Sequence, residues 1–147
     1  MRRNASQASS DDANVPKVAP PIVTNDDLDA ILTQYQNAEF LAVDTEFLRE
    51  RTYYSKLCLL QLAMPGKDDD TAVLVDPLSE GLSLAPLYDL FCDTSVVKVF
   101  HAARQDLEIF FVDAGVFPDP LFDTQVASYP PAYQANRLSV IHTHNIL

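Results

Sequence analysis

The sequence predicts one α/β domain, in which helices pack on a mixed β-sheet. Two patterns lead to this prediction. In the first half, short apolar runs are separated by polar turns rather than helices, which is typical of an antiparallel meander. In the second half, stretches with apolar residues every three to four positions alternate with short apolar runs, which indicates helices between strands. A chain of 147 residues can bury roughly two-thirds of its unfolded surface as a single domain.

The first half is predicted to begin with a helix and to continue as the meander. Thr24 is a typical helix cap, and Asp26 and Asp27 follow in the first turn, where acids are favourable. Four apolar residues then recur at the spacing of one helical face, namely Leu28, Ile31, Leu32 and Tyr35. The predicted strands are residues 40–46, 57–63 and 72–75, with a polar turn at 66–70.

The second half is predicted to alternate helices and strands. A helix is expected from Ser83 to about Cys92, with an apolar face made of Leu84, Leu87, Tyr88 and Phe91. A strand follows at 96–100, and then a helix from Ala103 to about Asp113 with Leu107, Phe110 and Phe111 on its apolar face. Leu121 and Phe122 form a brief fifth strand.

The composition and charge of the chain exclude or disfavour several classes of protein. No apolar run approaches the roughly 20 residues that cross a bilayer. Cys58 and Cys92 lie in apolar surroundings without CxxC spacing, which predicts buried, reduced thiols and a cytoplasmic location. The net charge of −11 disfavours simple binding to nucleic acid, unless bound cations reverse the local field. Residues 1–20 lack periodicity and are expected to be a disordered tail.

The chemistry is concentrated at the end of strand 40–46, where two acids are separated by one residue. Because side chains alternate along a strand, Asp44 and Glu46 project to one side and Thr45 to the other. Two neighbouring carboxylates repel each other unless a cation lies between them. A hard divalent cation such as Mg²⁺ or Mn²⁺ takes oxygen ligands from such acids. An Asp-x-Glu tripeptide alone is also consistent with a solvated strand end, because such tripeptides are common.

Asp106 is a third acid that the fold is expected to bring to the same place. It lies in the first turns of the helix that follows strand 96–100. Sites in α/β sheets form in the crevice beyond the strand ends, so Asp106 can meet Asp44 and Glu46 if strands 40–46 and 96–100 are neighbours. An acid near a helix N-terminus is also favoured by the helix dipole alone.

Three segments together resemble ribonuclease D. The segment Val43-Asp44-Thr45-Glu46-Phe47, followed by Arg51-Thr-Tyr-Tyr-Ser-Lys-Leu-Cys-Leu-Leu-Gln61-Leu, is similar to the family's first exonuclease motif. The segment His101-Ala-Ala-Arg-Gln-Asp106-Leu-Glu-Ile resembles the second motif, in the expected order and at the expected separation. Phe122-Asp123-Thr124-Gln125 also matches the family. The likeness covers about residues 22–128.

This resemblance implies a ribonuclease-H-like fold, with an exonuclease domain of the DEDD superfamily at residues 21–128. In that superfamily two divalent metal ions, Mg²⁺ or Mn²⁺, are held by four acids and hydrolyse the 3′-terminal phosphodiester. Asp44, Glu46 and Asp106 correspond by motif to the first three acids, as catalytic and metal-binding residues. The implied partner is RNA with a free 3′ end, such as a transfer RNA precursor or another small structured RNA.

Other residues of the motifs are expected to contact the last nucleotides of the RNA. These are Thr45, Phe47, Gln61 and His101, with Phe47 stacking or wedging against a base. Structural alternatives remain open, since Phe47 also fits a core position and Gln61 a hydrogen bond at the sheet edge. Arg49, Arg51 and Lys56 lie beside the acids and are suited to holding phosphates or to forming a solvated loop face.

After about Ser128 the sequence departs from the family pattern, in which a tyrosine or histidine precedes a fourth acid by four residues. No Asp or Glu follows Asp123, and Pro130 and Pro131 disfavour a helix. Residues 129–147 are therefore expected to be a divergent, disordered tail, which leaves the predicted fold incomplete at its C-terminus. Three interpretations stay open. They are an exoribonuclease domain, a catalytically inactive fragment with weak metal or RNA binding, and a related 3′→5′ DNA exonuclease.

Overall fold

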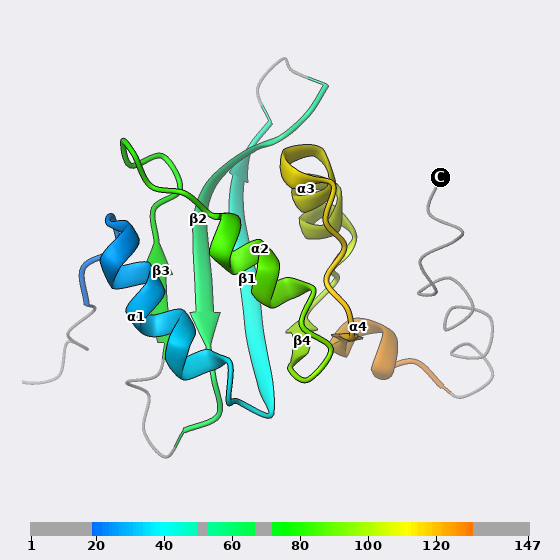
Figure 1. Cartoon of the computed structure of the whole chain (residues 1–147). Coiled ribbons are helices and arrows are strands. Elements are labelled where there is room, and N and C mark those ends of the chain that lie inside the picture. The colour runs from blue at the N-terminus through cyan, green and yellow to red at the C-terminus, as the bar shows by residue number, and fades with distance from the viewer. Residues whose placement is uncertain (1–18, 50–52, 67–71, 131–147) are drawn as a thin grey trace, which may run out of the picture.

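The computed structural model describes residues 19–49, 53–66 and 72–130, and within these ranges the chain forms a mixed sheet with helices on it (Figure 1). The strands are β1 (Phe40–Leu48), β2 (Lys56–Ala63), β3 (Ala72–Val75), β4 (Val97–Phe100) and β5 (Leu121–Asp123). The helices are α1 (Asn25–Tyr35), α2 (Ala85–Phe91), α3 (Arg104–Ala114) and α4 (Thr124–Ala127). All five predicted strands are confirmed, while the short helix α4 was not predicted.

The strand order β3-β2-β1-β4-β5 combines the two patterns seen in the sequence. The β1–β2 and β2–β3 pairs are antiparallel, which confirms the predicted meander. The β1–β4 and β4–β5 pairs are parallel, because a helix or a long loop returns the chain to the starting edge before each of these strands. Strands β1 and β4 are therefore neighbours, which is the condition for Asp106 to reach the end of β1.

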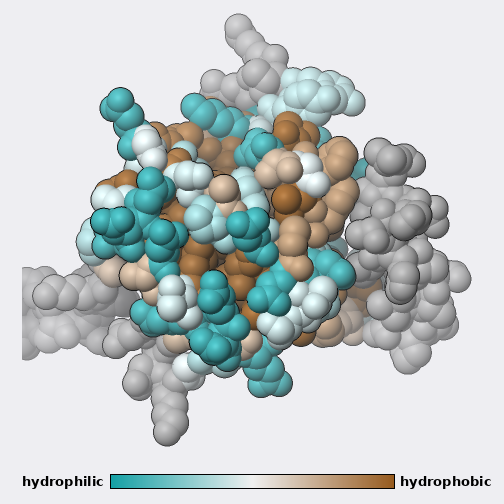
Figure 2. All heavy atoms as spheres, in the orientation of Figure 1, coloured by the Kyte–Doolittle hydropathy of each residue, from teal (hydrophilic) through white to brown (hydrophobic). Residues whose placement is uncertain are grey.

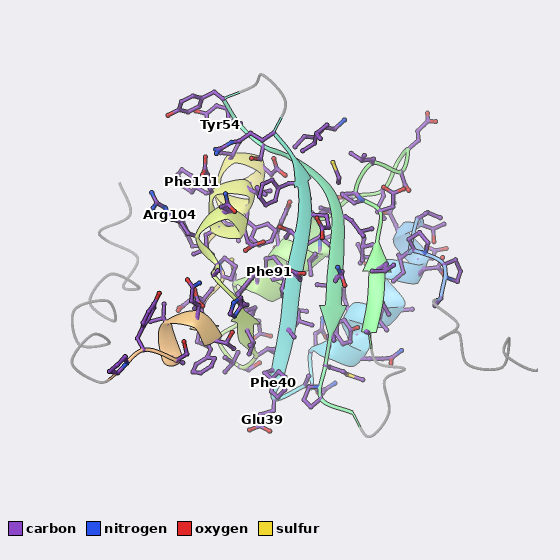
Figure 3. The ribbon with its side chains drawn as sticks, turned by 180° about the vertical axis from the view of Figure 1, so that it is seen from behind. Glu39, Phe40, Tyr54, Phe91, Arg104 and Phe111 are labelled. Atoms are coloured by element: carbon purple, nitrogen blue, oxygen red, sulfur yellow. The ribbon has the colours of Figure 1, made fainter. Side chains whose placement is uncertain are left out.

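Helices α1, α2 and α3 lie on one side of the sheet (Figure 1). Seen from behind, β1, β2 and β3 have no helix in front of them (Figure 3). The core lies between the helices and the covered face, and its largest buried side chains include Tyr35, Phe91 and Phe110. The Phe91 and Phe110 rings meet edge to face, with centroids 4.9 Å apart. The uncovered face of the sheet is the one on which the acids of β1 lie.

Helix α1 forms as the sequence predicts. The Thr24 hydroxyl accepts a hydrogen bond from the Asp27 backbone N–H at 3.2 Å, which caps the helix. Leu28, Leu32 and Tyr35 are buried at the predicted spacing. Helix α2 begins at Ala85 rather than Ser83, and it buries Leu87, Leu90 and Phe91.

Helix α3 corrects one prediction about which residues face the core. Its buried residues are Asp106, Ile109 and Phe110, whereas Phe111 is 43% exposed. These three occupy one helical face at the i, i+3, i+4 spacing, which turns Phe111 outward. The Phe111 ring stacks on Phe117 instead, at a centroid distance of 4.8 Å. Hydrophobic side chains accordingly show on the surface over α3 in Figure 2.

The prediction that both cysteines are buried is wrong. Both are free thiols, but Cys92 is exposed just after α2 and Cys58 is only half-buried. Cys58 lies where the β1–β2 register shifts, between the partners of Glu46 and Phe47, so it has no partner residue in the ladder. Its thiol donates to the Lys56 carbonyl at 3.3 Å.

Lys98 on β4 is a buried cation that the sequence did not reveal. Its side chain is fully buried, and Nζ donates to the backbone carbonyls of Asp93, Val96 and Asp119 at 2.7, 2.8 and 2.5 Å. Burial lowers the pKa of Lys98, an effect that the nearby Asp93 and Asp119 oppose. The lysine therefore ties the beginning of β4 to the loop that leads into β5.

The two predicted tails, residues 1–20 and 129–147, lie outside the described residues apart from positions 19–20 and 129–130. Most of the predicted turn at 66–70 also lies outside them. No helix within the described ranges has both the length and the apolar character needed to span a membrane.

Candidate active site

The end of β1 separates its side chains onto the two faces of the sheet as alternation requires. Leu41, Val43 and Thr45 are buried, whereas Asp44 and Glu46 are exposed. The two acids thus share the uncovered side of the sheet before the register shift that follows Glu46. Within the described residues both side chains are exposed and therefore accessible to a ligand.

Gln61 lies beside this pair of acids. It is the direct cross-strand partner of Asp44 on β2 and is exposed, so both side chains lie on the uncovered face. Phe47 lies just past the register shift and is half-buried against the core cluster. The Phe47 side chain therefore packs against the core and remains partly accessible to a ligand.

Asp106 reaches β1 through Thr45. It lies in the first turn of α3, is only 8% exposed, and its carboxylate accepts a hydrogen bond from the Thr45 hydroxyl at 2.5 Å. The third acid and the middle residue of the Asp-Thr-Glu segment are thus joined across 61 positions of sequence. This contact brings Asp106 to the end of β1 on the side to which Thr45 points, which is opposite to the side on which Asp44 and Glu46 are exposed.

The electrostatic surroundings of Asp106 disfavour its charge. Burial raises the pKa of Asp106, and the carboxylates of Asp44 and Asp123 raise it further. The hydrogen bond from Thr45 acts in the opposite direction but does not cancel these effects. A nearby cation would oppose these effects and stabilise the ionised form of Asp106.

The acids suit a hard cation by their chemistry, since all offer carboxylate oxygens. Among residues 19–49, 53–66 and 72–130, however, no three His, Cys, Asp or Glu side chains stand close enough to hold one metal ion together. The raised pKa of Asp106, whose charged form is disfavoured by burial and by neighbouring carboxylates, is the feature that favours a cation here. The grouping of Asp44, Glu46 and Asp106 around one ion stays a prediction.

The link between β4 and α3 is held by residues at the end of β5. The carboxylate of Asp123 accepts hydrogen bonds from four backbone N–H groups, those of Ala102, Ala103, Gln125 and Val126. His101 is exposed, and its Nδ1 lies 2.9 Å from the Thr124 hydroxyl. Ala102 has a φ of 58°, which is uncommon for a residue other than glycine. Asp123 thus fixes a strained link directly before the helix that carries Asp106.

A family model described as a 3′-5′ exonuclease matches residues 20–145 of this chain. The chain belongs to the 3′-5′ exonuclease family. Ribonuclease D of Jannaschia sp. is 64% identical over 107 residues, which are 73% of this chain and 28% of that protein. The chain therefore spans between a quarter and a third of the length of this curated relative.

Solved structures agree with this assignment. The crystal structure of Escherichia coli RNase D matches with a TM-score of 0.65 and 34% identity, covering 83% of this chain and 33% of that one. Brucella melitensis NrnC with bound Mg²⁺ matches with a TM-score of 0.53 and 30% identity, covering 64% and 45% of the two chains. The predicted resemblance to ribonuclease D and the ribonuclease-H-like fold class are confirmed.

Of the basic residues beside the acids, Arg49 and Lys56 lie within the described residues. Arg49 pairs with Glu108 at 3.3 Å on the surface, where both side chains are about half exposed. Such exposed pairs contribute little to stability, so a phosphate could compete for Arg49. Lys56 is exposed at the start of β2, and Arg51 lies outside the described residues.

The sequence did not predict the contacts that Asp123 and Thr124 make with the link between β4 and α3. Both lie in the Phe-Asp-Thr-Gln segment of the resemblance, and an aspartate before a short helix is a capping signal. That signal predicts a cap for α4, which Asp123 indeed provides. It does not predict that the same carboxylate also holds Ala102 and Ala103 from another part of the chain.

Proposed function

We propose that this chain is the exonuclease portion of a ribonuclease D-type 3′→5′ exoribonuclease. The observation that carries the proposal is the meeting of Asp106 with the end of β1, where Asp44 and Glu46 are exposed. The chain order of these three acids matches the motifs of the family, and the parallel pairing of β1 with β4 supports the approach of the helix that carries Asp106 to the end of β1. The related Escherichia coli protein is described as an exoribonuclease involved in structured RNA processing.

Asp44, Glu46 and Asp106 would hold the divalent cations, Mg²⁺ or Mn²⁺, that the family uses. The cations supply a water nucleophile and neutralise charge on the leaving 3′ oxygen. The Brucella relative with bound Mg²⁺ supports this choice of ion. Within this chain, Asp44 and Glu46 are the exposed ligands, and Asp106 gains most from a cation because its charge is otherwise disfavoured.

Of the other predicted site residues, we assign three to contacts with the RNA and one to holding a catalytic acid. Gln61 lies beside Asp44 on the uncovered face and would contact the terminal nucleotide. The half-exposed ring of Phe47 would pack against a base. His101 would contact the sugar at the end of β4. Because the Thr45 hydroxyl is buried and already donates to Asp106, we assign Thr45 to holding that acid rather than to touching RNA.

Full activity would require a fourth acid, because three carboxylates complete one metal site but not two. In this sequence no Asp or Glu follows Asp123. Residues that act as a unit in catalysis lose several orders of magnitude when one is missing. We therefore expect the 147-residue chain alone to bind a cation and RNA weakly and to turn over very slowly, and full activity to need a further segment.

The finer assignments are also proposals. Transfer RNA precursors or small structured RNAs are the expected substrates, in a cytoplasmic setting that suits the two free thiols. A 3′→5′ DNA exonuclease is the competing assignment, because the retained acids act on the phosphodiester and not on the sugar. The two differ in preference for RNA over DNA ends.

The test is an exonuclease assay of the chain alone and of a fusion to the C-terminal part of a ribonuclease D relative. With Mg²⁺ or Mn²⁺ and RNA bearing a free 3′ hydroxyl, the fusion should release nucleoside monophosphates. Asp44→Ala should abolish the release, whereas Asp29→Ala, at an exposed acid on α1, should leave it unchanged. Equal release by the fusion and its Asp44→Ala variant would contradict the proposed site, and a preference for DNA ends would favour the competing assignment.

A further inference from the structure

The hydrogen bonds around Thr124 determine which nitrogen of His101 carries a proton. The Thr124 hydroxyl lies 3.1 Å from the Phe100 carbonyl, which can only accept, and 2.9 Å from Nδ1 of His101. A hydroxyl has a single hydrogen, and the carbonyl can only accept, so both contacts are hydrogen bonds only when the hydroxyl donates to the carbonyl. We infer that the Thr124 oxygen then accepts from Nδ1–H of His101. In the neutral imidazole, Nε2 is consequently the nitrogen with the lone pair.

The backbone that follows His101 is held by hydrogen bonds to Asp123. Asp123 holds the N–H groups of Ala102 and Ala103, one with each carboxylate oxygen, at 3.0 Å in both cases. The left-handed conformation of Ala102, which is costly for alanine, is stabilised by these two bonds. His101 therefore lies between two fixed points, β4 on one side and the tethered link to α3 on the other.

Nε2 of His101 is available to a ligand. The residue is exposed, and among the described residues no other group forms a hydrogen bond with its ring. It directly follows the C-terminal end of β4, the parallel neighbour of the strand that carries Asp44. Ligands of α/β sheets bind beyond these strand ends.

We propose that Thr124 positions His101 so that its Nε2 accepts a hydrogen bond from a ribose 2′-hydroxyl near the 3′ end of the RNA. This proposal rests on the proposed function and adds to it a contact that selects RNA over DNA. Neutral Nε2 accepts a hydrogen bond, so it cannot pair with a phosphate oxygen, which is also an acceptor. A 2′-hydroxyl can donate, occurs in every ribonucleotide whatever its base, and is absent from DNA.

The positioning role can be tested without any nuclease activity. Long-range ¹H–¹⁵N spectra of the ¹⁵N-histidine-labelled 147-residue chain, at about pH 8 where an ordinary imidazole is neutral, report the tautomer of each ring. The chain has three histidines, and the His101→Ala spectrum assigns the signal of interest. We expect the Nδ1–H tautomer in the native chain and in Thr124→Ser, which keeps the hydroxyl.

Thr124→Val should release His101 to the Nε2–H tautomer that free histidine favours in water. The matched control Thr94→Val, at an exposed threonine in the turn before β4, should leave the spectrum unchanged. Circular dichroism of each variant verifies that the fold is retained. An Nε2–H tautomer in the native chain, or no change in Thr124→Val, would overturn the positioning role.

The ligand is tested by the affinities for oligo(A) and oligo(dA) of equal length in Mg²⁺. The native chain should prefer oligo(A), and both His101→Ala and Thr124→Val should weaken oligo(A) binding by about fivefold, as expected for one net hydrogen bond. Binding of oligo(dA) should not change. An undiminished preference in His101→Ala would overturn the 2′-hydroxyl contact. If the native chain binds neither oligonucleotide, the proposed function fails together with this ligand, while the tautomer result still stands.

Discussion

The C-terminal ends of the parallel strands β1 and β5 both carry carboxylates, but these acids differ in their hydrogen bonding and burial. At the end of β5, Asp123 accepts four backbone N–H groups, so its charge is satisfied by the protein itself. At the end of β1, Asp44 and Glu46 are exposed, and Asp106 is buried with its charge disfavoured. The four hydrogen bonds give Asp123 a structural role, whereas the exposed acids of β1 and the disfavoured charge of Asp106 are the features on which we base the proposed cation site.

The largest expected effect is at the satisfied acid. Asp123→Ala removes the acceptor of four N–H groups and frees the strained link at Ala102, so the free energy of unfolding should fall by roughly 3 kcal/mol. Urea denaturation of the native chain and the variant measures the change. Asp29→Ala, at an exposed acid on α1, should change stability by no more than about 0.5 kcal/mol. A comparable loss in both variants would show that Asp123 has no special structural role.

Thr45 should show a smaller effect that depends on pH. Thr45→Val removes the hydroxyl that stabilises the Asp106 carboxylate, so the free energy of unfolding should fall by about 1.5 kcal/mol at neutral pH. Because the hydrogen bond lowers the pKa of Asp106, the loss should be smaller in acid, where Asp106 is protonated. Thr45→Ser keeps the hydroxyl and should retain the native pH profile. An identical loss at neutral and acid pH would assign the effect to packing alone.

Asp106→Asn should increase stability without metal. The pKa of Asp106 is raised in the folded chain, so the folded state holds this proton more tightly than the unfolded state does. The free energy of unfolding should therefore fall as pH rises from the ordinary aspartate value of about 3.9 through the raised pKa. The neutral variant lacks this penalty and should be more stable by roughly 1 kcal/mol near pH 7. Thermal unfolding in a chelating buffer across pH gives the comparison, and lower stability at neutral pH would contradict the raised pKa.

Local patterns predicted most of the fold. The capped stripe of α1 and the apolar runs of the meander depend on neighbours in sequence, so period and turn chemistry identify them. The exposed pair Asp44 and Glu46 follows from strand alternation for the same reason.

The failures of prediction concern long-range packing. Three features depend on residues that are far apart in sequence and meet only in the folded sheet. They are the hydrogen bond between Thr45 and Asp106, the hydrogen bonds of Asp123 to Ala102 and Ala103, and the hydrogen bonds of the buried Lys98. Phe111 and Cys92 are apolar residues, and each directly follows another apolar residue that is buried. The sequence of one helix does not specify which of two adjacent apolar residues will face the core. Long-range contacts of this kind decide the electrostatics of the candidate site.

The most direct test of the comparison between the two strand ends is a calorimetric titration of the chain with Mn²⁺. The native chain should bind the ion weakly but saturably, and Asp44→Ala and Asp106→Asn should each weaken binding by at least about tenfold, because each removes a carboxylate ligand. Asp29→Ala should bind as the native chain does, and Thr124→Ser should as well. Equal Mn²⁺ affinity in the native chain and in Asp44→Ala would show that the acids at the end of β1 do not form a cation site.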